Sequence, residues 1–98
     1  MAQIRYRFTA RVWKYPGPAS WYFVSVPNGV SKEIRRLSLG KEEGWGRLKA
    51  IARIGDAEWP TALWYDTRHH TYLMPIKAEI RKRVGISEGS NVKVSINV

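Results

Sequence analysis

A module that occurs twice restricts the fold of this chain more than any other feature. Each copy combines an apolar strand ending in proline, a short basic helix containing Glu-Ile-Arg, a glycine turn and a second strand, and the copies span residues 22–51 and 72–96. A unit of this size cannot bury a core of its own. Two copies therefore predict one closed body with pseudo-twofold symmetry, in which Arg35 and Arg81 take matching places on two helices.

Length and composition predict one small domain over residues 1–98, because 44% of the residues are hydrophobic and five are Trp. The absence of Cys excludes disulfides and thiolate metal sites. No apolar run approaches the roughly 20 residues that a membrane helix needs. We therefore expect a soluble cytoplasmic protein without a membrane partner.

Alternation of apolar and polar residues predicts a mainly β protein of about six strands. Residues 4–14, 46–54 and 92–98 alternate with the period of two that is typical of half-buried strands. The stretch 20–26 is rich in aromatic and β-branched residues and follows a Pro-Gly-Pro break. We expect it to form a hairpin with residues 4–14.

Two short helices are expected between the strands. The first has Ser31 as its N-cap and Gly40 as its stop, and the second covers about residues 77–84 and is stopped by Gly85. Both are basic on one side and apolar on the other, which predicts that they pack against the strands by one face.

Residues 73–92 read as a strand, a proline, a helix with Ile-Arg-Lys, then Gly-Ile, Glu-Gly and a closing strand. This arrangement is similar to that of AbrB-type swapped-hairpin DNA-binding domains. It is preceded here by Trp-Gly-Arg-Leu-Lys-Ala at 45–50 and Trp-Pro-Thr-Ala-Leu at 59–63. The combination resembles the uncharacterised domain-of-unknown-function family numbered 1905.

The resemblance implies a small closed double-split β-barrel with an internal pseudo-twofold duplication. One chain would then perform what two swapped subunits do in AbrB-type dimers, so a monomer is expected rather than a homodimer. The resemblance implies no established activity and no cofactor. Ser90-Asn91 departs from the Asp that usually follows Gly in such closing turns, which concerns the geometry of that turn alone.

The net charge of +9 is the global property that suggests a partner. A basic surface attracts phosphates, and residues 1–32 contain no acid at all. DNA or RNA is therefore the partner class that we expect. The alternative is that the excess of Lys and Arg only keeps a small protein soluble.

The outer faces of the first and third strands carry the candidate nucleic-acid-binding residues. If these strands are neighbours, their cations form one patch with a ring at its end for stacking. The candidates are Arg5, Arg7, Arg11, Arg47, Lys49, Arg53 and Trp13. The competing interpretation is a solvated exterior, because a strand with one face inward must turn polar groups outward.

A second set of residues suggests an aromatic-lined pocket for a small ligand, or an accessory module built around it. The set is Trp21, Trp45, Trp59, Trp64 and Tyr65. Such rings more often fill the core of a small protein. His69 and His70 are adjacent and poorly placed to bind one metal, so no metal site is expected. Neither a nucleophile motif nor a phosphate loop is present, and we expect no catalysis.

Overall fold

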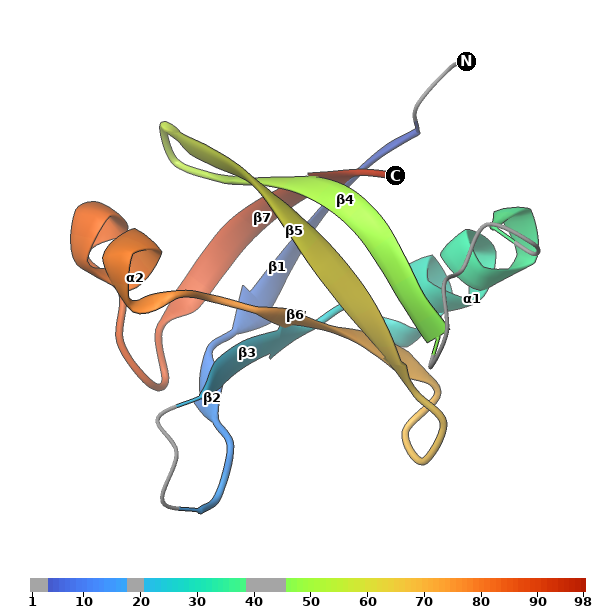
Figure 1. Cartoon of the computed structure of the whole chain (residues 1–98), viewed down its shortest axis with the longest axis horizontal. Coiled ribbons are helices and arrows are strands. Elements are labelled where there is room, and N and C mark those ends of the chain that lie inside the picture. The colour runs from blue at the N-terminus through green and yellow to red at the C-terminus, as the bar shows by residue number, and fades with distance from the viewer. Residues whose placement is uncertain (1–3, 18–20, 39–45) are drawn as a thin grey trace.

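The sheet of this protein is curled (Figure 1). The two strands at the ends of its strand order follow each other directly in the chain. The computed structural model describes residues 4–17, 21–38 and 46–98. In chain order the elements are β1 (Arg5–Arg11), β2 (Trp13–Lys14), β3 (Tyr22–Ser25), α1 (Asn28–Leu37), β4 (Arg47–Ile54), β5 (Ala57–Asp66), β6 (Thr71–Pro75), α2 (Ala78–Val84) and β7 (Asn91–Asn97).

All strands belong to one antiparallel sheet in the order β1-β7-β4-β5-β6-β3-β2. The mainly β class and the two helices are confirmed for the described residues. Seven strands replace the expected six because the first expected strand is divided at Val12. The backbone N–H of Val12 donates to Ser90 O over 2.8 Å, and its carbonyl accepts from Gly89 N over 2.8 Å.

The expected hairpin between the first two strands was wrong over most of its length. Only the two residues of β2 pair with β3, whereas all seven residues of β1 pair with β7. The register sets Tyr6 against Ile96 and Phe8 against Val94. Strand β7 therefore offers β1 a long apolar face, which the four-residue strand β3 cannot match.

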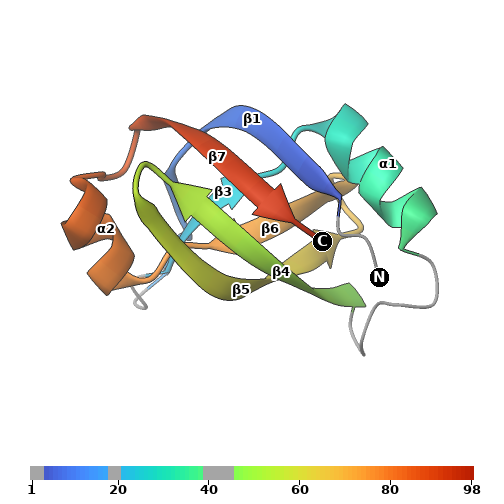
Figure 2. The same cartoon turned by 90° about the horizontal axis from the view of Figure 1, so that it is seen from above.

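The core lies inside the curl of the sheet, and the two helices cover its opposite ends (Figure 2). Leu63, Tyr72 and Ile96 are fully buried there. Ile34 of α1 and Ile80 of α2 belong to the same cluster. The apolar faces of the helices thus complete a core that the strands alone leave open. None of the described helices is long and apolar enough to cross a membrane.

Helix α1 begins four residues earlier than expected, with Pro27 rather than Ser31 as its N-cap. Ser31 lies one turn inside the helix and is fully buried. Its hydroxyl donates to Val26 O and accepts from Tyr72 N–H, each over 3.0 Å. A buried hydroxyl needs such partners, and these two join α1 to β6 and to the residue that follows β3. The expected stop, Gly40, lies outside the described residues.

The backbone bonds that flank the β3–β6 pair recur 50 residues apart. Val26 N donates to Tyr72 O over 2.8 Å, and Ile76 N donates to Tyr22 O over 2.9 Å. Both helices begin two residues after these donors, at Asn28 and Ala78.

The same spacing of 50 residues relates two hydrogen bonds that a side chain of each helix makes to a carbonyl just before that helix. The Arg81 guanidinium donates to Ile76 O, as the Ser31 hydroxyl donates to Val26 O. Arg81 therefore corresponds in position to Ser31. The expectation that Arg35 and Arg81 take matching places was wrong, because the Glu-Ile-Arg motifs are 46 residues apart and the helix starts are 50 apart.

Helix α2 ends at Gly85 as expected, and this glycine differs from Gly29 in a testable way. Gly85 has φ +68°, where Ala is strained by about 1 kcal/mol or more, whereas Gly29 lies in α1 with open space beside its Cα. We expect Gly85→Ala to lower the free energy of unfolding by about 1 kcal/mol and Gly29→Ala to raise it by about 0.5 kcal/mol. Urea denaturation measures both, and a change of the same sign in the two variants would contradict the assignment.

Candidate nucleic-acid interface

Strand register brings cations of β1 and β4 to the two sides of β7. Ser95 of β7 pairs with Arg7 of β1 on one side and with Arg53 of β4 on the other. Residues directly opposite each other share a face of the sheet, and here this is the outer face. Strands β1 and β4 are thus not neighbours, but a single intervening strand separates their arginines by about 10 Å of backbone.

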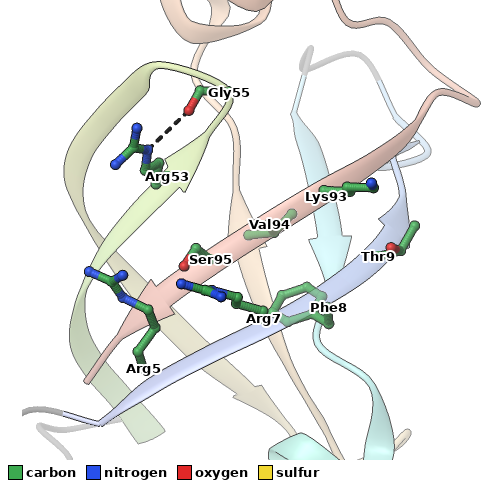
Figure 3. Close-up of a pocket in the computed structure, with 9 residues that line it drawn as sticks. All are labelled: Arg5, Arg7, Phe8, Thr9, Arg53, Gly55, Lys93, Val94 and Ser95. Atoms are coloured by element: carbon green, nitrogen blue, oxygen red, sulfur yellow. Dashed lines mark hydrogen bonds between the residues drawn. The ribbon is translucent and has the colours of Figure 1, made fainter.

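These arginines line an open hollow of about 450 Å³ on the outer face, which we call the basic hollow (Figure 3). Lys93 of β7 also lines it, although this residue is not among the predicted cations. The alternation of residues 92–98 was the signal that could have found Lys93, since it puts this side chain outward between two basic strands. No acid is among the described lining residues, which are Arg5, Arg7, Phe8, Thr9, Arg53, Gly55, Lys93, Val94 and Ser95.

Two of the guanidinium groups are held by one nitrogen each. Arg5 Nε donates to Asn97 Oδ1 over 3.1 Å, and Arg53 Nε donates to Gly55 O over 3.0 Å. Figure 3 shows Arg7 reaching across β7 toward Ser95. With Nε engaged, the terminal nitrogens of Arg5 and Arg53 are available for a phosphate or carboxylate oxygen. The hollow is therefore suited to an anion.

The other predicted cations lie outside the basic hollow. Arg47 and Lys49 line a second hollow with Lys77, on the side of β4 that faces β5. Arg47 lies 5.8 Å from the ring centre of Trp64, its direct partner across the strands. Arg11 pairs with Asn91 at the far end of β1. The single patch of six cations is thus divided along the sheet.

Trp13 lies in β2, beyond the end of β1 that is opposite Arg5. Its indole N–H donates to Ser25 Oγ over 3.0 Å, and its ring lies 5.1 Å from Phe23. These contacts hold Trp13 over β3, away from the basic hollow.

The residues predicted for an aromatic pocket lie in separate places. Trp59 is 6% exposed and belongs to the core, whereas Trp64 is on the outer face of β5 and lines the second hollow. Trp21 is exposed beside β3, and Tyr65 lines a third hollow next to α1. Trp45 lies outside the described residues.

Comparison with protein families identifies the chain. Residues 8–96 match the family described as "Domain of unknown function (DUF1905)". The chain belongs to the DUF1905 family. No curated protein matches it.

Two helix arginines of this DUF1905 protein have a packing role that sequence patterns did not reveal. The guanidinium of Arg35 lies 3.8 Å from the ring centre of Tyr65, and that of Arg81 lies 3.8 Å from Tyr22. Guanidinium groups stack on aromatic faces, which joins each helix to a strand. Helix spacing alone predicted only charge at the helix ends, because Tyr65 and Tyr22 are distant in sequence.

His69 and His70 lie in the turn between β5 and β6. His69 Nδ1 is 2.7 Å from Asp66 Oδ2, and no group of three or more potential metal-binding side chains is found in residues 4–17, 21–38 and 46–98. The hydrogen bond with His69 is the main reason that the pKa of Asp66 is below its ordinary value of 3.8, and the N–H of Arg68 contributes further.

Replacing His69 with Ala should raise the pKa of Asp66 toward 3.8, because the carboxylate loses its main stabilising contact. The contact contributes stability at any pH above the pKa of Asp66 in the unfolded chain. This contribution is lost as the pH falls through the lower pKa that Asp66 has in the folded protein. Carbonyl NMR of the Asp66 side chain measures the titration. His70→Asn is the matched control, since Asn tolerates the positive φ of 55° at this position, and it should leave the Asp66 pKa unchanged. Equal shifts in both variants would contradict the contact.

Proposed function

We propose that this DUF1905 protein is a non-enzymatic binding protein that binds DNA or RNA through the basic hollow. The observation that carries the proposal is the pairing of Ser95 with both Arg7 and Arg53, in a hollow that Arg5 and Lys93 also line without an acid among its described lining. Cations gathered in this way attract a polyphosphate backbone and release its counterions.

The chemistry of the hollow favours backbone contacts over base reading. Guanidinium groups bind phosphate oxygens with two parallel hydrogen bonds, and three of the four cations are arginines. The hollow is open and lies across a strand, with no helix to enter a groove and read base edges. Binding is therefore weak, sensitive to salt and largely independent of sequence.

Catalysis has little support at this surface. Its hydroxyl groups, Thr9 and Ser95, share the described lining with neither a histidine nor a carboxylate that could act as a base. A ligand site built from the predicted aromatic residues has less support as well, because the described ones lie in separate places.

We also interpret the curled sheet as a closed double-split β-barrel with two related halves. The one-residue step between β1 and β2, at opposite ends of the strand order, supports closure. The hydrogen bonds that recur 50 residues apart support duplication. So do two similar outer-face pairs, Trp13 with Phe23 and Trp64 with Leu73. A barrel completed within one chain agrees with a monomer.

Replacing Arg5, Arg7 and Arg53 together with Ala tests the proposed function. Removing three phosphate contacts should reduce the dependence of log affinity on log salt by about 2 for a single strand. Fluorescence anisotropy of a labelled oligonucleotide between 20 and about 200 mM salt measures this slope.

The matched control is the triple variant Arg68→Ala, Lys82→Ala and Arg83→Ala. It removes the same charge from exposed positions outside the basic hollow, so its slope should stay close to that of the unchanged protein. Equal slopes in the two triple variants would show that net charge alone attracts the oligonucleotide. Absence of binding at low salt would refute the function.

A further inference from the structure

Exposed cations on β1 are followed along the chain by aromatic rings in and beside β2. Arg5, Arg7 and Arg11 are exposed along β1, and Trp13 and Tyr15 follow at the same alternation beyond Val12. From Arg5 to Arg11, β1 extends over about 20 Å. A linear molecule along β1 and then β2 would meet cations first and rings afterward.

The rings belong to a cluster that we call the aromatic surface, which lies on β2, on β3 and on the residue next to each: Trp13, Tyr15, Trp21 and Phe23. Phe23 is its centre, with ring-centre distances of 5.1 Å to Trp13, 6.3 Å to Tyr15 and 6.2 Å to Trp21. The planes of Trp21 and Phe23 are only 11° apart, which makes the pair stacked. The backbone bond from Tyr15 N to Trp21 O holds the two flanks together over 2.8 Å.

The aromatic surface is exposed rather than packed into the core. Tyr15 and Trp21 are each 53% exposed, whereas Trp59 is 6% exposed. Contiguous exposed apolar rings are costly to a soluble protein and mark binding sites. The cluster therefore has a role that core packing does not explain.

Its chemistry and surroundings point to one kind of occupant. Flat rings in a fixed stack bind other flat rings, and the exposed Arg11 precedes Trp13 by two residues at the same alternation. Bases in a duplex are already stacked and paired, so their faces are closed to an aromatic side chain. In a single strand those faces are available, and stacking on protein rings tolerates any base.

We propose that the aromatic surface stacks unpaired bases of a single-stranded nucleic acid whose backbone follows β1 to the basic hollow. This inference rests on the proposed function and deepens it, because it makes the single strand the preferred form. Arg5, Arg7 and Arg53 then supply the salt-sensitive part of the affinity, and the aromatic surface supplies a part that salt does not change.

The test compares a fluorescein-labelled DNA strand of 15 nucleotides with the same strand in a duplex, both at low salt. We expect the single strand to bind at least tenfold more tightly than the duplex. Trp21→Leu should weaken binding of the single strand by about fivefold to tenfold and leave its salt slope and the duplex affinity unchanged. Trp21 is half exposed, so this variant keeps the core intact, and urea denaturation verifies its stability.

Trp64→Leu is the matched control, because Trp64 is also an exposed tryptophan, at 39%, and lies on β5 outside the aromatic surface. Its affinity for the single strand should match that of the unchanged protein. Equal affinities for strand and duplex, or equal losses in the Trp21 and Trp64 variants, would overturn the inference.

The outcome also separates the two proposals. A salt slope that depends on Arg5, Arg7 and Arg53 while Trp21→Leu has no effect leaves the proposed function standing and removes only the stacking role. Failure of both strand and duplex to bind overturns the proposed function, and this inference with it.

Discussion

The change of pairing partner at Val12 is the constraint on which the rest of the structure depends. One stretch of chain pairs with β7 before this residue and with β3 after it, so the two ends of the strand order are joined by a single residue. Val12 is 1% exposed, and both of its backbone groups bond to the turn before β7. The curl that encloses the core follows from this dual pairing.

The same change of pairing partner determines where the candidate site lies. Because β1 pairs with β7 along its full length, Arg7 meets Ser95, and β4 brings Arg53 to the other side of that residue. Because the chain pairs with β3 after Val12, Trp13 lies opposite Phe23, away from these arginines. The curl of the sheet and the separation of cations from rings thus have one cause.

The helices are attached to the sheet by buried polar contacts as well as by apolar packing. The Ser31 hydroxyl donates to Val26 O and accepts from Tyr72 N–H, and all three residues are fully buried. The stacked arginines Arg35 and Arg81 add a second connection at each helix. This explains why two short basic helices can remain on a small domain with a net charge of +9.

Local patterns predicted the strands well because a period of two is a property of neighbouring residues. The alternation in residues 4–14 correctly indicated that Tyr6 and Val12 face inward and Arg5, Arg7 and Arg11 outward. The glycine stop at Gly85 was predictable for the same reason. Strand pairing could not be predicted in this way. All of residues 4–14 were therefore expected to pair with residues 20–26, whereas only Trp13 and Lys14 do so.

The sequence by itself determined the mainly β class, the outward cations and the DUF1905 family, since each depends on residues close together in the chain. Tertiary structure decided that β7 lies between β1 and β4, that Lys93 joins Arg5, Arg7 and Arg53, and that Ser31 bonds to both Val26 and Tyr72. These contacts join residues far apart in sequence. Which two strands pair depends on the total apolar area that is buried across the whole sheet. A local sequence pattern does not determine that area.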